Sequence, residues 1–117
     1  MPVQWIEYKG HKILYADYRG LVSEDKMLEN LKAEEEFYKT ISSKILSLND
    51  YRDTYVSNNF INKVTELGKI NKDKNLKSAI LGISGVKKLL LNTFSTISGM
   101  PVRSFSDETE AKEYLVS

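Results

Sequence analysis

Two similar stretches of the sequence place an acid, a tyrosine and a base in the same order after an apolar run. The first is "DYRGLVS", residues 17–23, and the second is "DYRDTYVS", residues 50–57. Carboxylate and guanidinium groups in this pattern can bind charged ligands or a protein partner. Crowded carboxylates can also transfer protons. Which chemistry applies depends on the elements that position these groups.

The spacing of apolar residues predicts strands alternating with helices. Strands are expected at residues 4–8, 12–18, 43–49, 76–83 and 102–105. Helices are expected at 24–40, 57–70 and 84–99, and from 107 onward, with caps at Ser23, Ser57, Ser84 and Asp107. This order predicts a single α/β domain over residues 1–117, with a mixed five-stranded sheet, an N-terminal antiparallel hairpin, βα units and about four helices.

Parallel strands would bring both acid–tyrosine–base triplets to the same carboxyl edge of the sheet. Ligands of open α/β sheets bind outside that edge, where the strand order reverses. We therefore expect one neighbourhood of candidate ligand-binding residues, composed of Asp17, Arg19, Asp50, Arg52, Asp53, Ser57 and Ser84. A simpler interpretation stays open, in which the Asp–Arg pairs satisfy each other and the serines only cap helices.

The stretch "LGISGVKKLLL" adds a candidate anion site. If Ser84 caps a helix, Lys87 and Lys88 fall in its first turn, where the helix dipole disfavours cations. Backbone N–H groups near Gly85 together with the two ammonium groups would suit a phosphate or carboxylate. Lysines that point to solvent are the alternative.

Two further groups of residues invite interpretation. Tyr51 and Tyr55 fall in the expected loop after the third strand, where they can line a pocket or a protein contact, or cover the sheet edge. The run Glu34-Glu35-Glu36 is typical of the solvent-exposed face of a helix.

A catalytic interpretation is the alternative to binding. A small enzyme could use the cluster of Asp17, Asp50 and Asp53, but Arg19 and Arg52 would oppose the raised pKa values that acid catalysis needs. His11, the only histidine, is expected at the opposite end of its strand, which precludes a Ser–His–Asp relay. We therefore predict no catalytic residues, no metal and no cofactor.

Composition narrows the classes further. The chain has no cysteine, which excludes disulfides and thiolate chemistry and agrees with a reducing interior. No apolar stretch is long enough to cross a bilayer and no signal peptide is evident, so a cytoplasmic location is expected. Residues 63–103 hold eight bases and two acids, a balance of +6 that suits an anionic partner. Nucleic acid is not expected, because aromatic and basic residues do not alternate along a strand.

Four segments in this order and spacing resemble a bacterial family of small STAS-like domains related to the sporulation anti-anti-sigma factor, also described as STAS and CRAL-TRIO-like proteins. The segments are "ILYADYRGLVSEDKML", "ILSLNDYRDTYVS", "KSAILGISGVKKLLL" and "FSDETEAKEYL". The resemblance covers essentially the whole chain. It implies a STAS-type sheet and a regulatory or binding module that takes a protein partner or a small anionic, lipidic or nucleotide ligand.

The resemblance also implies a candidate phosphorylation site. Anti-sigma antagonists of this type carry a phosphorylated serine at the start of the helix after the third strand, and Ser57 occupies the corresponding place. Those antagonists have an Asp-Ser-Ser-Gly stretch directly after the strand. Here "NDYRDTYVSNN" is longer and lacks the glycine.

A homodimer is a further expectation, because Leu91 lies off the apolar stripe of its expected helix.

Overall fold

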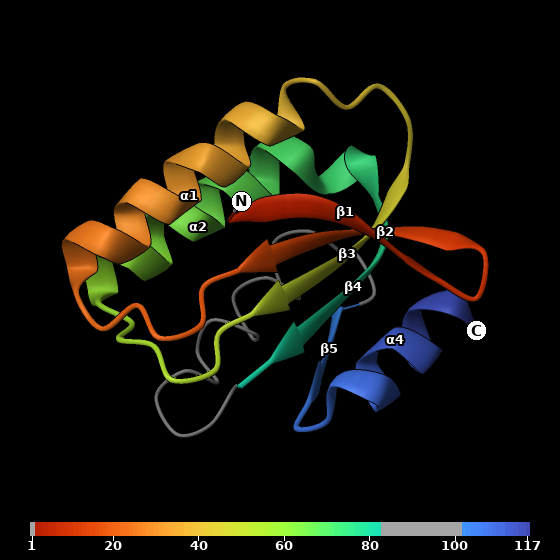
Figure 1. The fold of residues 1–117 in the computed structure, drawn as a ribbon. Coiled ribbons are helices and arrows are strands. Elements are labelled where there is room, and N and C mark those ends of the chain that lie inside the picture. The colour runs from red at the N-terminus through yellow and green to blue at the C-terminus, as the bar shows by residue number, and fades with distance from the viewer. Residues whose placement is uncertain (1, 83–101) are drawn as a thin grey trace.

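The computed structural model describes residues 2–82 and 102–117 (Figure 1). In chain order the elements are β1 (Val3–Tyr8), β2 (His11–Asp17), α1 (Glu24–Tyr38), β3 (Ile45–Asp50), α2 (Asn58–Asn71), the 3-10 turn η1 (Lys72–Lys74), β4 (Asn75–Leu81), β5 (Val102–Phe105) and α4 (Glu108–Val116). Each expected strand is present within two residues of its predicted bounds. The helix expected at 84–99 lies outside the described residues, which contain three α-helices.

The strands form one mixed sheet in the order β1-β2-β3-β4-β5. β1 pairs with β2 antiparallel, and the remaining neighbours are parallel. The α/β class, the five strands and the opening hairpin are therefore as predicted. The hairpin turn consists of Lys9 and Gly10, both with positive φ (50° and 81°), which suits the right-handed twist of two paired strands.

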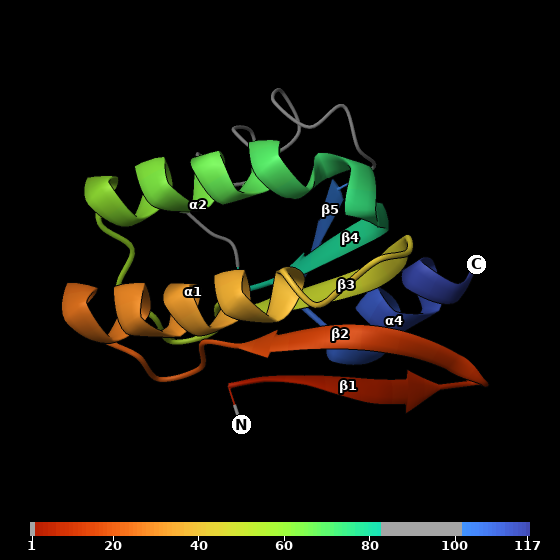
Figure 2. The ribbon, with the colours of Figure 1, turned by 90° about the horizontal axis from the view of Figure 1, so that it is seen from above.

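The strand order differs from the sequence-based expectation in one respect. We expected a ligand crevice where the strand order reverses, but the described strands follow one another across the sheet without a reversal. Because successive right-handed crossovers that advance in one direction stay on the same face, α1 and α2 lie side by side on one face of the sheet. Figures 1 and 2 show this layer, and they show α4, the third described α-helix, on the opposite face.

Capping residues set the start of each of the three described α-helices. The Ser23 hydroxyl accepts a hydrogen bond from Lys26 N at 3.3 Å, and the Ser57 hydroxyl accepts one from Phe60 N at 3.1 Å. At α4, Asp107 Oδ2 accepts from Glu110 N at 3.0 Å. Three of the four predicted caps are therefore confirmed, and Ser84 lies outside the described residues. Ser23 and Ser57 thus have a structural role as helix caps.

The sheet separates two apolar cores. On the face of α1 and α2, the core contains Met27, Leu31, Phe60, Val64 and Leu67 from the helices. On the other face, Ile13, Leu48 and Leu81 pack with Ala111 and Leu115 of α4. Strands β2, β3 and β4 are buried on both faces, which explains their nearly continuous apolar runs.

The structure resolves an open question about Tyr51 and corrects the prediction for Glu34. Tyr51 is fully buried and packs against Tyr18 and Phe60, because the chain after β3 turns its ring into the core. Glu34 is also buried, whereas Glu35 and Glu36 are exposed as predicted. Glu34 follows Leu31 by three residues and precedes Tyr38 by four, so it lies on the inward stripe of α1. None of the described helices is long and apolar enough to cross a membrane.

Candidate functional site at the carboxyl edge of the sheet

The register of the sheet explains why the acid–tyrosine–base triplet occurs twice. Asp17 ends β2, Asp50 ends β3, and the two are direct register partners. The main chain continues the parallel pairing beyond them, with Tyr18 N donating to Asp50 O at 2.9 Å. Both tyrosine rings then enter the core, 4.9 Å apart between centroids. Each triplet therefore delivers its acid to the edge and its tyrosine to the interior.

Asp50 is the centre of a network of ion pairs and hydrogen bonds at this edge. Its side chain is fully buried, and it accepts two bonds from the Arg52 guanidinium, at 2.9 and 2.6 Å. The Tyr15 hydroxyl donates to Asp50 Oδ2 at 2.7 Å, and Arg19 Nε lies 3.7 Å from the same oxygen. A buried carboxylate with this many donors is well compensated.

The network extends in two directions from Asp50. Towards β2, Arg19 forms a bidentate pair with Asp17 through two bonds of 2.9 Å. Towards α4, Arg52 Nη2 donates to Glu108 Oε1 at 3.0 Å, and Glu108 pairs with Lys112 at 2.7 Å. Four of the predicted residues, Asp17, Arg19, Asp50 and Arg52, are therefore brought together.

Glu108 belongs to this network but was not predicted from the sequence. It stands in the first turn of α4, 56 residues from Arg52. A signal was available, because α4 follows the parallel strand β5 and therefore starts at the same edge.

The acids of the network are held in their ionised form. Burial alone would raise the pKa of Asp50, but the hydrogen bonds from Arg52 and Tyr15 bring that pKa below its usual value. The hydrogen bonds from Arg19 lower the pKa of Asp17, and those from Lys112 and Arg52 lower that of Glu108. These carboxylates suit charge pairing and not proton donation near neutral pH.

Main-chain hydrogen bonds join the loop after β2 to the loop after β3. Gly20 N donates to Arg52 O at 3.2 Å, and Tyr55 N donates to Leu21 O at 3.0 Å. Gly82, at the end of β4, contributes a close approach, since a Cβ there would lie 2.6 Å from Arg52 N. Gly82, the first glycine of "GISG", therefore allows the main chain at Tyr51 and Arg52 to pack directly against it.

The outer surface of the two loops is partly apolar. Val22 is 74% exposed and Tyr55 is 52% exposed, although main-chain hydrogen bonds hold the two loops that carry them. Asp53 is exposed with a positive φ of 57°, and it joins no ion pair within the described part of the chain. Ser57 is half-buried at the start of α2. We call the surface of residues 18–23 and 51–57 the paired-loop surface.

The predicted anion site cannot be located on this fold, because Ser84, Gly85, Lys87 and Lys88 lie outside the described residues, as does Leu91. Their roles stay predictions.

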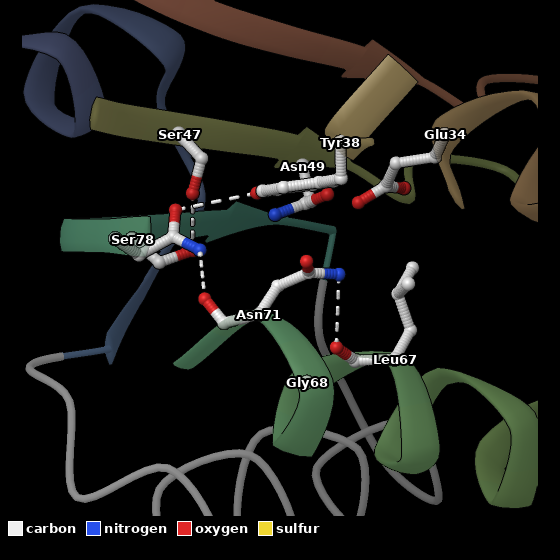
Figure 3. Close-up of a pocket in the computed structure, with 9 residues that line it drawn as sticks. Glu34, Tyr38, Ser47, Asn49, Leu67, Gly68, Asn71 and Ser78 are labelled. Atoms are coloured by element: carbon white, nitrogen blue, oxygen red, sulfur yellow. Dashed lines mark hydrogen bonds between the residues drawn. The ribbon is translucent and has the colours of Figure 1, made fainter. Parts of the chain in front are cut away.

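A second polar region lies between α1, α2 and the sheet and was missed by the sequence analysis (Figure 3). Its lining includes Glu34, Tyr38, Asn49 and Asn71, all buried. Burial raises the pKa of Glu34 from 4.5 to about 7. The signal for Glu34 was its place on the apolar stripe of α1, and the signal for Asn49 was a polar residue in a strand buried on both faces.

Comparison with known proteins supports the fold assignment. A solved structure, described as an uncharacterized protein from the DUF3478 family with a SpoIIAA-like fold from Shewanella loihica PV-4, matches with a TM-score of 0.68. The match covers 97% of this chain and 91% of that one at 14% sequence identity. No family model matches the sequence, and no curated protein matches it. The chain thus has a SpoIIAA-like, STAS-like α/β fold, as the sequence resemblance implied.

Proposed function

We propose that this protein is a non-catalytic regulatory module that binds a protein partner through the paired-loop surface. The observation that supports this most directly is that two large apolar side chains, Val22 and Tyr55, are exposed on loops that hydrogen bonds hold together. Exposed apolar residues framed by charged ones are typical of protein-binding surfaces.

The ion-pair network under these loops supports the proposal. Arg19 is half exposed, so its guanidinium can meet an acidic group of a partner while it remains paired with Asp17. Arg52 is one-third exposed, and its pairing with Asp50 and Glu108 fixes its position. Such preorganised groups lose little conformational entropy on binding, which favours affinity. Charged groups at the rim would mainly set the rate and specificity of association.

A protein partner fits this surface better than a small ligand does. The three carboxylates of the network already compensate its two arginines, so a free anion would have to compete with them. A protein partner can instead cover Val22 and Tyr55 and gain free energy from burying them. The arginines would orient such a partner on the surface. The SpoIIAA-like fold agrees with a regulatory role, although the likeness concerns the fold alone.

A pair of double variants tests the proposal. Val22→Ser with Tyr55→Ser removes the apolar groups of the paired-loop surface. Ile70→Ser with Leu76→Ser serves as the matched control, because Ile70 is 74% and Leu76 is 52% exposed, as Val22 and Tyr55 are, but away from these loops. Each protein is immobilised and the proteins captured from a lysate of its own source are quantified by mass spectrometry.

We expect a set of captured proteins that binds the wild type and the control variant and is lost from the Val22→Ser/Tyr55→Ser variant. Near-ultraviolet circular dichroism confirms that each variant keeps its tertiary packing. Identical capture by all three proteins would show that the paired-loop surface does not bind the partner.

A further inference from the structure

The cavity between α1, α2 and the sheet is polar but carries no basic side chain among its described lining residues. It offers about 20 Å³ to the centre of a water-sized group, which is enough for one or two such groups. Its polar lining comes from four elements: α1 contributes Glu34 and Tyr38, β3 contributes Ser47 and Asn49, α2 contributes Asn71, and β4 contributes Asn75 and Ser78. Figure 3 shows the side-chain ends of Glu34, Asn49 and Asn71 directed toward the same space.

Glu34 brings an uncompensated carboxyl group to this cavity. Only 5% of the residue is exposed. The Tyr18 hydroxyl donates to Glu34 Oε1 at 2.7 Å, and within residues 2–82 and 102–117 no lysine, arginine or histidine pairs with the carboxylate. A buried carboxylate is stable in its charged form only with a compensating positive group.

The amide of Asn49 is the second feature that points to a ligand. Asn49 is 7% exposed and lines the cavity, and its side chain forms no hydrogen bond within the described residues. Because most buried amides have a hydrogen-bond partner, this amide is available to a group bound in the cavity. Asn71 donates its amide N–H to Leu67 O at 3.1 Å, which leaves its amide oxygen as an acceptor.

We propose that this cavity binds one small monovalent cation, either an alkali-metal ion or an ammonium group, between the Glu34 carboxylate and the amide oxygens of Asn49 and Asn71. The Tyr38 hydroxyl, which donates to Asn75 Oδ1 at 3.2 Å, keeps a lone pair as a further oxygen ligand. One carboxylate with several neutral oxygens suits a singly charged ion. The described residues contain no group of three or more acidic, histidine or cysteine ligands, which a transition metal would favour.

Thermal unfolding of the full chain in different chlorides tests the proposal. The salts are ammonium, potassium and sodium chloride, with tetramethylammonium chloride at equal ionic strength as a cation too large for the cavity. A ligand at about ten times its Kd raises the Tm of a domain of this size by about 5 °C, and we expect a rise of this order near pH 8. The ion that gives the largest rise distinguishes an alkali-metal site from an ammonium site.

Two variants separate the site from general salt effects. Glu34→Gln keeps the shape of the side chain but removes its charge, and it should abolish the difference between the small cations and tetramethylammonium. Glu35→Gln makes the same change on the adjacent, exposed residue of α1 and should leave the difference intact. In NMR spectra, the side-chain NH₂ signals of Asn49 should shift on titration with the best cation.

Equal Tm values in all four salts, or a cation effect that Glu34→Gln retains, would overturn the proposal. This test is independent of the paired-loop surface, so its failure would leave the proposed function in place.

Discussion

At the scale of single residues, Gly82 fixes how closely the ends of β3 and β4 approach. Its φ is +84°, and a Cβ at this position would lie 2.6 Å from Arg52 N and 2.8 Å from Tyr51 C. Both contacts are with main-chain atoms, which cannot rotate away as a side chain can. The position of the Arg52 backbone, and with it the ion pair to Asp50, therefore depends on the absence of a side chain at residue 82.

Gly82→Ala should lower the free energy of unfolding by about 2–4 kcal/mol, because strain at positive φ and overpacking against Arg52 each contribute roughly 1–2 kcal/mol. Gly20→Ala is the matched control, since Gly20 has a φ of +76° but no heavy atom within 4 Å of the added Cβ. It should lose only the backbone contribution of about 1–2 kcal/mol. Urea denaturation measures both. Equal losses would show that the close approach at Gly82 contributes nothing.

Sequence-based predictions for single residues succeeded for charged residues at strand ends and failed for a charged residue that faces the core. Asp17 and Asp50 were predicted together because each ends an apolar run. Glu34 was assigned to solvent because its two acidic neighbours are exposed, although its spacing from Leu31 and Tyr38 places it inward. The direction of Tyr51 stayed open in the sequence analysis, because a predicted loop does not reveal which way its side chains point.

At the scale of elements, Ser57 sets the start of α2 and is also the candidate phosphorylation site. The Ser57 hydroxyl caps the helix through Phe60 N, and the first turn of α2 contains no acidic residue. A phosphate on Ser57 would place negative charge at the positive end of the helix dipole, which favours it. Phosphorylation of Ser57 is therefore compatible with the fold.

If phosphorylation of Ser57 controls partner binding, Ser57→Asp and Ser57→Asn should capture different sets of proteins, because only the aspartate carries a negative charge. Both residues are good helix caps, so the comparison avoids the loss of about 1 kcal/mol that Ser57→Ala would cause. Quantitative pull-down measures the difference, with urea denaturation to confirm equal stability. If both variants capture the same proteins in the same amounts, negative charge at residue 57 does not control partner binding.

The elements themselves were predictable, but their arrangement was not. Strands β2, β3 and β4 have similar apolar sequences because each is covered on both faces. Such a sequence does not indicate which strand lies next to it in the sheet. The repeated triplet was the one local signal for adjacency, and it correctly placed the ends of β2 and β3 together. The sequential strand order removes the reversal at which we expected a crevice.

At the scale of the whole molecule, stability should depend on pH in two opposite ways. The pKa values of Asp17 and Asp50 are lowered on folding, so their contribution is present above their unfolded pKa of 3.8 and is lost as the pH falls below it. The pKa of Glu34 is raised on folding, so stability falls as the pH rises from 4.5 to about 7. For these groups, maximum stability should therefore lie at about pH 4 to 4.5.

Urea denaturation from mild acid to above neutral pH in tetramethylammonium buffer checks this. Ionising Glu34 should reduce the free energy of unfolding by roughly 3 kcal/mol between its unfolded and folded pKa values. Glu34→Gln should remove most of this decline and stabilise the protein near neutral pH, whereas Glu35→Gln should not. A wild-type profile that stays flat from mild acid to neutral pH would contradict the burial of a chargeable Glu34.

Helix α4 joins parts of the chain that are far apart in sequence. Glu113 accepts a hydrogen bond from the Tyr8 hydroxyl at 2.6 Å beside the β1–β2 turn, while Lys77 of β4 donates to the carbonyl oxygens of Tyr114 and Ser117 at 3.2 and 2.8 Å. During synthesis, α1 and α2 can pack on their face of the sheet before α4 has been made. Of the described helices, only α4 packs on the opposite face, against Ile13, Leu48 and Leu81. A nascent chain that has reached α2 but not α4 therefore lacks the helical part of this second core, and a chaperone would be most useful to it in that interval.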